Sequence, residues 1–183
     1  MDQREILVFD TGPLSHFARG GWLGVLKLVE ADRLAVVPDL VVDELRRGAA
    51  SDAQIQAVLD APWLEHRELR TADEIHAFAE FASLLVVGHR NRGEAGVLAL
   101  ASTLGATAVI DDGAGRRAAQ ERGIRLRPTL ALMCDAIRDG LLTVLLVSAL
   151  ADDLLATSYR LPFAPGEFEK WAIENGFVPP DPA

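Results

Sequence analysis

The chain has 183 residues, half of them hydrophobic and a quarter charged, so it can bury one sizeable core and does not belong to the disordered class. Its formal net charge of −9 argues against a protein that holds nucleic acid mainly by charge, and its single cysteine, Cys134, excludes an internal disulfide and a cysteine-cluster metal site. From its length we expect a single domain over residues 1–183. Because it has neither a cleavable signal segment nor an apolar stretch long enough to span a bilayer, we expect it in the cytoplasm.

Short apolar runs that end in turn residues predict buried strands, and longer stretches with apolar residues at helical spacing predict helices. In the first third of the chain the expected elements are a strand over 6–9, a helix opened by Pro13, a helix over 22–29, a strand over 34–37, a helix from 39 to about 47 and a helix over 51–59. Asp39 and Ser51 are expected to cap the last two helices.

The rest of the chain continues the alternation. The expected elements are an extended piece at 63–64, a helix over 71–85, a basic loop over 88–93, a helix over 94–104, a strand over 107–110, a helix over 113–122, a strand over 124–126, and helices over 129–138 and 144–157. Thr71 and Glu74 have the spacing of a capping box at the start of their helix. The last five residues include three prolines, which predicts a frayed end.

The predicted strands are continuous apolar runs without polar alternation, which is typical of a parallel sheet that is covered on both faces. We therefore expect a three-layer α/β/α sandwich with a mainly parallel central sheet, followed by C-terminal helices. Its core is expected over about 1–128, a helical extension over about 129–175 and a frayed tail over 176–183. Ligands of such sheets bind outside the carboxyl ends of the strands, and Asp10, Asp111 and Asp112 directly follow predicted strands.

Two further acids stand in unusual surroundings. On the helix from 39, Glu44 falls in the apolar stripe opposite a charged face, so we expect a positively charged partner near it. Glu94 is the one charged residue in an otherwise nearly apolar helix. Each acid also has an ordinary explanation: Asp10 as a turn residue, Glu44 as a rim residue or an arginine partner, Glu94 as a favourable charge in the first helical turn, and the 111–112 pair as a turn and a helix cap.

Together, these acids would be gathered into one cleft by a parallel sheet. Carboxylates without Cys or His are the ligand set that Mg²⁺ and Mn²⁺ prefer. Two such ions ~4 Å apart can activate water and stabilise the leaving oxygen of a phosphodiester. The pattern therefore favours metal-dependent hydrolysis of phosphodiester bonds.

The order of these motifs resembles that of the PIN-domain nucleases over roughly residues 6–142. The four segments that carry the resemblance are VFDTGPLSHF, VPDLVVDELRRG, RGEAGVLALA and AVIDDGAGRRAAQERGI. They look like the family segments that would supply Asp10 with Thr11, Glu44, Glu94, and Asp112 with Asp111 beside it. Within the family, the chain is most similar to a PIN-like branch related to the ribonuclease toxins of toxin–antitoxin pairs.

The resemblance implies a Mg²⁺- or Mn²⁺-dependent endoribonuclease, the toxin of such a pair, in which metal-activated water attacks the RNA. The four acids implied as catalytic and metal-binding are Asp10, Glu44, Glu94 and Asp112, with Asp111 as a further metal ligand and Thr11 as a supporting hydrogen-bonding residue. It also implies a small antitoxin partner and a homodimer.

One position departs from the family pattern. Many members carry Thr where this chain has Ile110, which leaves either Asp111 or Asp112 as the ligand. The same departure leaves open an alternative function, a catalytically weak or inactive PIN-like module that binds RNA or protein.

Residues 88–128 carry a net positive charge, with seven arginines and four acids, although the chain as a whole is acidic. The arginines that flank the candidate acids are Arg90, Arg92, Arg116 and Arg117. They are expected to contact the phosphate backbone of RNA, and the alternative is that they are ordinary solvated residues.

Overall fold

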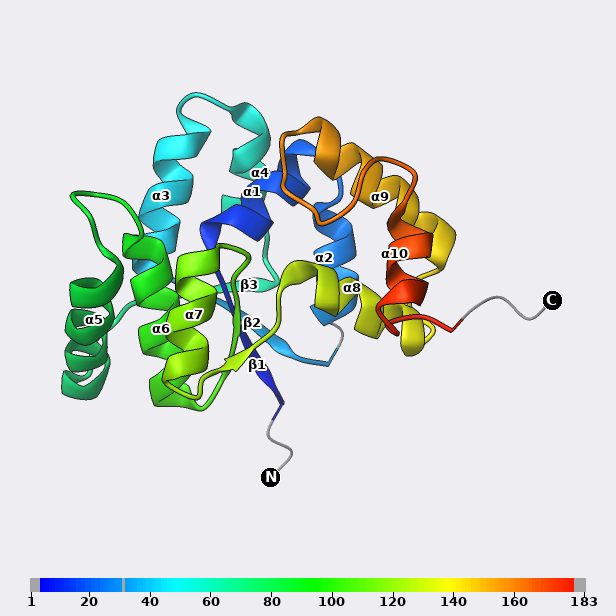
Figure 1. Cartoon of the computed structure of the whole chain (residues 1–183). Helices are drawn as coiled ribbons and strands as arrows, with labels where there is room; N and C mark the ends of the chain where they lie inside the picture. The colour runs from blue at the N-terminus through cyan, green and yellow to red at the C-terminus, as the bar shows by residue number, and fades with distance from the viewer. Residues whose placement is uncertain (1–3, 31, 180–183) are drawn as a thin grey trace.

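The computed structural model describes residues 4–30 and 32–179, and its centre is a five-stranded sheet (Figure 1). The strands are β1 (Ile6–Phe9), β2 (Leu34–Pro38), β3 (Leu64–Arg67), β4 (Thr107–Val109) and β5 (Arg125–Leu126). Their order is β3-β2-β1-β4-β5, and every pairing is parallel. The expected parallel sheet is therefore confirmed, and the extended piece at 63–64 becomes its edge strand β3.

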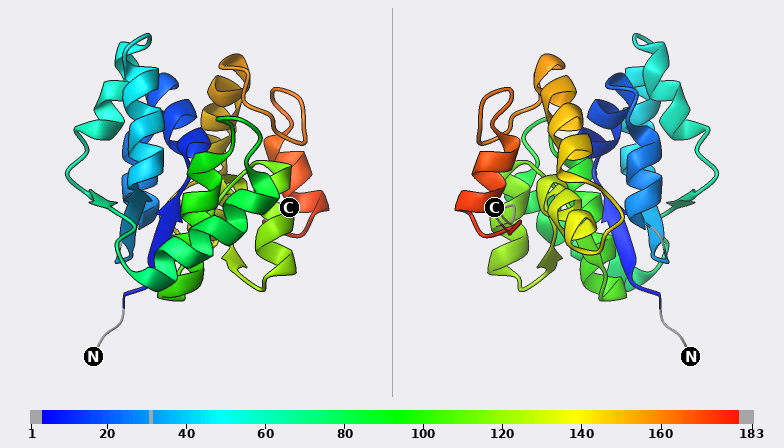
Figure 2. Two further views of the ribbon diagram at one scale, coloured as in Figure 1. Left: turned by 90° about the vertical axis from the view of Figure 1, so that its left-hand side faces the viewer. Right: turned by 90° about the vertical axis from the view of Figure 1, so that its right-hand side faces the viewer.

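The described part of the chain also contains ten α-helices and one short 3₁₀ helix, η1 (Ala53–Ile55). The α-helices are α1 (Thr11–Arg19), α2 (Leu23–Glu30), α3 (Asp39–Ala49), α4 (Gln56–Leu59), α5 (Ala72–Leu85), α6 (Arg92–Leu104), α7 (Gly113–Glu121), α8 (Thr129–Arg138), α9 (Val144–Ala156) and α10 (Phe168–Glu174). Helices α3, α5, α6 and α7 lie on one side of the sheet, and α2, α8, α9 and α10 lie on the other (Figures 1 and 2). This is the expected three-layer α/β/α sandwich with C-terminal helices.

The apolar character of the inner strands follows from this double cover. Val8, Val36 and Ala108 occupy neighbouring strands and are almost completely buried, because helices pack on both faces of the sheet. The register pairs Phe9 with Val109, and the chain continues from both strands at the same edge of the sheet. The acids that follow β1 and β4 are therefore brought side by side.

Two expected helix caps are wrong. Pro38 is the N-cap of α3 without a side-chain hydrogen bond, because β2 runs directly into the helix and Asp39 is already helical. The Oδ1 atom of Asp39 is buried and has no hydrogen-bond partner among the described residues. Ser51 donates instead to the carbonyl of Gly48 at 3.1 Å, and Asp52 caps η1. The helix expected over 51–59 is thus divided into η1 and α4.

Other local predictions are confirmed. Thr71 and Glu74 form both hydrogen bonds of a capping box at the start of α5.

At the other end of the chain, Phe177 stacks on Trp171 with 5.2 Å between the ring centroids, and Val178 is buried. The fraying expected from residue 176 is therefore wrong for these two residues, and residues 180–183 of the expected tail lie outside the described part. Among the described helices, none is long and apolar enough to cross a membrane.

Candidate active site

Asp10 lies at the carboxyl end of the central strand β1, directly before the first residue of α1. Its side chain is the N-cap of that helix and accepts a hydrogen bond from the backbone N–H of Gly12 at 3.5 Å. The residue is only 8 % exposed. Burial, followed by the nearby carboxylates of Glu44 and Asp111, raises the pKa of Asp10 from its usual 3.8 to about 7. Asp10 is therefore both a helix cap and an acid whose ionisation the fold opposes.

Glu44 reaches the same region from α3, where it is half-buried. Its Oε2 accepts a hydrogen bond from the hydroxyl of Thr11 at 2.6 Å, and its Oε1 accepts one from the backbone N–H of Gly93 at 2.9 Å. No Lys or Arg side chain pairs with Glu44 among the described residues; two neutral donors at the starts of α1 and α6 bind its two carboxylate oxygens. Helix starts carry partial positive charge, so they suit this task.

Gly93 is required by this close approach. A Cβ atom at position 93 would lie 2.6 Å from Oε2 of Glu44 and 3.0 Å from its other two carboxylate atoms. A side chain at position 93 would push this carboxylate away, so the observed hydrogen bond between Glu44 and the N–H of residue 93 depends on the glycine. The glycine preceding Glu94 in the RGEAG motif has a structural reason that the sequence pattern alone does not reveal.

Glu94 projects from the first turn of α6 and is 8 % exposed. Its Oε2 is buried and accepts no hydrogen bond from the described residues. Burial, followed by the charges of Asp10, Asp112 and Glu44, raises the pKa of Glu94 from 4.5 to about 8. The charges of acids from three other segments thus act on Glu94, and among the described residues its buried Oε2 has no partner.

Asp111 and Asp112 have different surroundings. Asp111 accepts hydrogen bonds from the backbone N–H and hydroxyl of Thr129, at 2.8 and 2.6 Å, and a third from the hydroxyl of Tyr159. Asp112 is exposed, caps α7 through the N–H of Ala114 at 2.7 Å, and keeps its other oxygen free of hydrogen bonds from the described residues. Asp112 thus retains ligand capacity, whereas both oxygens of Asp111 are already used.

We expect Asp111→Asn to lower the free energy of unfolding by about 1–3 kcal/mol. The amide nitrogen of Asn replaces one carboxylate oxygen and cannot accept the hydrogen bonds made to that oxygen. Asp112→Asn should change stability by no more than about 0.5 kcal/mol, because Asn is an equally good helix cap. Urea unfolding followed by tryptophan fluorescence would measure both. A larger loss for Asp112→Asn than for Asp111→Asn would contradict this division of roles.

Tyr159 and Thr129 were not among the predicted site residues. Tyr159 is buried, its hydroxyl contacts an acid 48 positions earlier in the chain, and its ring lies 4.7 Å from that of His16. Burial, together with the charge of Asp111, raises the pKa of the Tyr159 hydroxyl. Since no spacing rule links these positions, only the chain's single tyrosine could have served as a signal. The two residues tie the C-terminal helices to the end of β4.

The donor set fits a divalent cation. In residues 4–30 and 32–179, no three His, Cys, Asp or Glu side chains lie close enough as placed to hold a metal ion, and several of the acids accept hydrogen bonds from N–H or hydroxyl donors. The oxygen of Glu94 without a partner and the free oxygen of Asp112 are hard donors of the kind that Mg²⁺ and Mn²⁺ prefer. A cation would also offset the burial and the neighbouring negative charges that oppose ionisation of Asp10 and Glu94.

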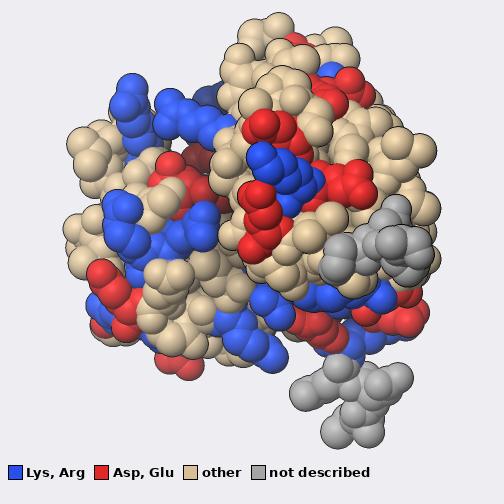
Figure 3. All heavy atoms as spheres, turned by 45° about the vertical axis from the view of Figure 1, so that its right-hand side comes forward, with Lys and Arg blue, Asp and Glu red and all other residues tan. Residues whose placement is uncertain are grey.

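The four arginines that flank the acids are exposed, and within the described residues none makes an ion pair or a side-chain hydrogen bond; they are Arg90, Arg92, Arg116 and Arg117. The other three arginines of residues 88–128 are engaged: Arg122 with Glu80, Arg125 with the carbonyl of Gly105, and Arg127 with Asp135. Figure 3 shows acidic side chains in a hollow of the surface, with basic side chains along its margins. Positive charge is thus available near the acids.

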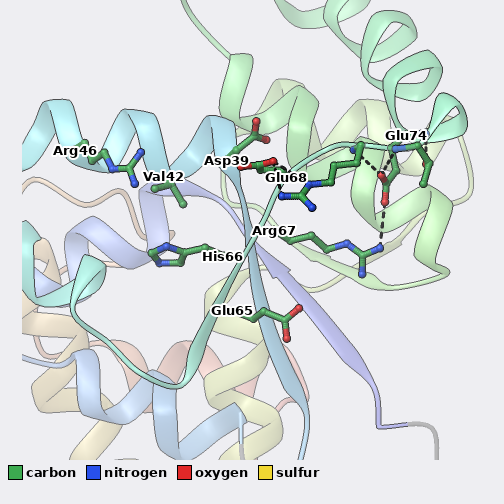
Figure 4. Close-up of a pocket in the computed structure, with 10 residues that line it drawn as sticks. Asp39, Val42, Arg46, Glu65, His66, Arg67, Glu68 and Glu74 are labelled. Atoms are coloured by element: carbon green, nitrogen blue, oxygen red, sulfur yellow. Dashed lines mark hydrogen bonds and ion pairs between the residues drawn. The ribbon is translucent and has the colours of Figure 1, made fainter.

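A cavity of about 540 Å³ lies elsewhere, beside the edge strand β3 (Figure 4). Its charges are largely paired internally, since Arg67 contacts Glu74 at 3.2 Å and Arg70 contacts Glu68 at 2.9 Å. None of the predicted site residues lines it. A second cavity of about 470 Å³ is bordered by Asp111 and Arg116, next to the acids.

Comparison with known proteins agrees with this arrangement. A family model described as a PIN domain matches residues 6–164, which is most of the chain and includes all four acidic segments. No curated protein matches the chain.

Proposed function

The chain belongs to the PIN-domain family, and from this premise we propose that it is a Mg²⁺- or Mn²⁺-dependent endoribonuclease. PIN domains are in general nucleases that use divalent metals, which supports a hydrolase acting on nucleic acid. In this proposal Asp10, Glu44, Glu94 and Asp112 hold the metal ions and hydrolysis cuts RNA phosphodiester bonds.

The observation that carries the proposal is the buried Oε2 of Glu94, which has no hydrogen-bond partner among the described residues. Burying a carboxylate without a partner costs several kcal/mol, and here the charges of three further acids also oppose its ionisation. A fold that served only as a scaffold would gain from replacing such a cluster with apolar residues. Binding a divalent cation would offset the cost, so the cluster makes physical sense as a metal site.

The residues of the cluster have different tasks. A bound Mg²⁺ or Mn²⁺ would lower the pKa of a water molecule and stabilise charge on the scissile phosphate. Thr11 and the backbone N–H of Gly93 hold Glu44 in a fixed orientation. Asp112 is exposed and can turn toward a ligand, while Asp111 is a positioning residue that holds the end of β4 against Thr129 and Tyr159.

The test is cleavage of labelled single-stranded RNAs of varied sequence with Mn²⁺ or Mg²⁺, using wild type, Glu94→Gln and the control Glu65→Gln. Glu65 is exposed on the edge strand β3, so its variant should behave like wild type. We expect cleavage by wild type that a chelator stops and excess metal restores, and loss of cleavage in Glu94→Gln. Equal activity of wild type and Glu94→Gln, or no cleavage of any RNA, would contradict the proposal.

One observation favours a second candidate function, an RNA- or protein-binding module with little catalysis. Ile110 stands where many family members carry Thr. Its side chain is completely buried and has no hydroxyl, so this position donates no side-chain hydrogen bond to the acids. Under this alternative, wild type and Glu94→Gln would bind RNA equally and neither would cleave it. The same cleavage and binding assays therefore decide between the two functions.

The four unpaired arginines are proposed to bind the RNA backbone. Replacing all four with alanine should weaken RNA binding and reduce the dependence of log affinity on log salt concentration by about 0.7 for each phosphate that is no longer neutralised. A matched control replaces four arginines that already have partners: Arg122, Arg125, Arg127 and Arg138. Fluorescence anisotropy at several salt concentrations measures both variants. Equal salt dependence in the two would contradict the assignment.

The proposal extends to partners. As in related toxin–antitoxin ribonucleases, we propose that the protein acts in the cytoplasm as a homodimer whose activity is blocked by a small antitoxin protein. Light scattering at micromolar concentration tests the dimer, and a mass of one chain would contradict it. The product of a neighbouring gene is the first antitoxin candidate to test for inhibition of cleavage.

A further inference from the structure

The cavity of about 470 Å³ beside the acids has an unusual composition. Its walls combine the rings of Tyr159, Trp171 and Phe177 with two arginines, Arg116 and Arg160. Its volume falls within the range of about 300–1,000 Å³ that is typical of small-ligand pockets. Flat apolar walls next to positive charge suit a ligand that has both an aromatic ring and a negative group.

The positive charge in this cavity is available to a ligand. Arg116 and Arg160 are both exposed, and neither makes an ion pair or a side-chain hydrogen bond with the described residues. In contrast, the arginines that line the larger cavity beside β3 are paired with acids: Arg46 with Asp43, Arg67 with Glu74 and Arg70 with Glu68. Of these two cavities, the smaller one is therefore better suited to bind an anionic group.

The cavity adjoins the candidate active site at Asp111 and Arg116. Asp111 lines it, receives the hydrogen bond from Tyr159, and is followed in the chain by Asp112. Arg116 belongs both to the cavity and to the arginines that flank the acids. A nucleic-acid strand whose phosphate lies at the acids can therefore extend a neighbouring nucleotide into the cavity.

The aromatic wall belongs to this chain's own C-terminal part. Trp171 lies on α10 and Phe177 follows it, and both fall outside residues 6–164, which the family model matches. The two rings stack with an interplanar angle of 19°, and Phe163 also packs against Trp171 with 5.2 Å between centroids. Trp171 and Phe177 are thus held in place by the C-terminal aromatic cluster and lie outside the matched residues, whereas Tyr159 lies within them.

We propose that this cavity binds one nucleotide of a single-stranded RNA substrate, adjacent to the phosphate that is cut. The base stacks on the aromatic wall, and its phosphate is held by Arg116 and Arg160. Aromatic side chains stack any base, and the shape of the cavity then selects among them. This inference rests on the proposed function for the position of the scissile phosphate, and it makes Trp171 a specificity-determining residue.

The experiment measures binding in the presence of a chelator, so that it does not depend on cleavage. A fluorescent single-stranded RNA hexamer is compared with hexamers in which one position lacks its base, for wild type, Trp171→Leu and Trp171→Phe. Trp63→Leu is the matched control, since Trp63 is also half-buried but does not line this cavity. Thermal melting of every variant checks that it is folded.

For wild type, removal of the base at one position should weaken binding by about 5- to 150-fold, the range expected for one base–aromatic stack. This ratio should fall to about one in Trp171→Leu and persist in Trp171→Phe and Trp63→Leu. Arg160→Ala should weaken binding of intact and base-free hexamers by the same factor. These results support the nucleotide site even if no metal-dependent cleavage is found, which would contradict only the proposed endoribonuclease activity.

Two outcomes would overturn the inference. The first is a ratio of about one at every position of the hexamer in wild type, or a ratio that Trp171→Leu leaves unchanged. The second is binding of N-acetyltryptophanamide that Trp171→Leu removes, without any effect of base removal, which would assign the cavity to a protein side chain.

Discussion

Asp10→Asn is expected to abolish metal-dependent RNA cleavage while making the metal-free protein more stable. Loss of a metal ligand removes several kcal/mol of transition-state stabilisation, which corresponds to a fall in rate of at least about 100- to 1,000-fold. The neutral amide can still cap α1 through the N–H of Gly12, so the fold should be preserved. Opposite effects on activity and stability are typical of a residue that serves function at the expense of folding.

The gain in stability follows from the pKa of Asp10. The folded protein raises this pKa from 3.8 to about 7, so folding disfavours the ionised form. The wild type therefore loses stability as the pH rises from about 4 to about 7, and the loss persists above pH 7. Glu94 continues this trend, because its pKa is raised to about 8. At pH 8 we expect Asp10→Asn to raise the free energy of unfolding by about 1–3 kcal/mol.

Urea unfolding of the metal-free protein at pH 5 and pH 8, together with the RNA cleavage assay, measures both effects. Asp43→Asn is the control, because Asp43 lies on the exposed side of α3 and should change neither quantity. Cleavage by Asp10→Asn at the wild-type rate would contradict its role as a metal ligand. A lower stability than wild type at pH 8 would contradict the account of the buried charge.

Gly93→Ala is expected to reduce cleavage by at least about 100-fold and stability by about 1–3 kcal/mol. The new Cβ would lie 2.6 Å from Oε2 of Glu44, so the carboxylate must move and its hydrogen bond to the N–H of residue 93 is broken. The substitution leaves every acid in the sequence unchanged. It therefore tests the position of Glu44 and not its chemistry.

Gly24→Ala is the matched control, because Gly24 lies in α2 and a Cβ there would meet nothing within 4 Å. This substitution should stabilise the protein by up to about 1 kcal/mol through helix propensity, with unchanged cleavage. Adding Glu44→Asp to Gly93→Ala shortens the side chain by one methylene group, which makes room for the new Cβ. The double variant should therefore recover part of the lost stability. Wild-type cleavage and stability in Gly93→Ala would show that Glu44 does not need its observed orientation.

Local sequence was sufficient wherever a short-range pattern decides the structure. The continuous apolar runs of β1, β2 and β4 predicted a parallel, doubly covered sheet, and Thr71 with Glu74 predicted a capping box. The caps expected at Asp39 and Ser51 were wrong, although both residue types favour caps. In each case a neighbour competed: β2 continued through Pro38, and Asp52 was better placed to start η1.

The fold class and the unusual acids could be recognised from the sequence, because strand periodicity and an acid in an apolar stripe are properties of neighbouring residues. The contacts of each acid could not, because they depend on how distant segments pack. The tertiary structure joined Glu44 to Thr11 and Gly93 and both oxygens of Asp111 to Thr129 and Tyr159, whereas Asp112 accepts only the N–H of Ala114 among the described residues. These hydrogen bonds join segments 18 to 49 residues apart, and no local pattern encodes a hydrogen bond that exists only after helices from distant segments have packed.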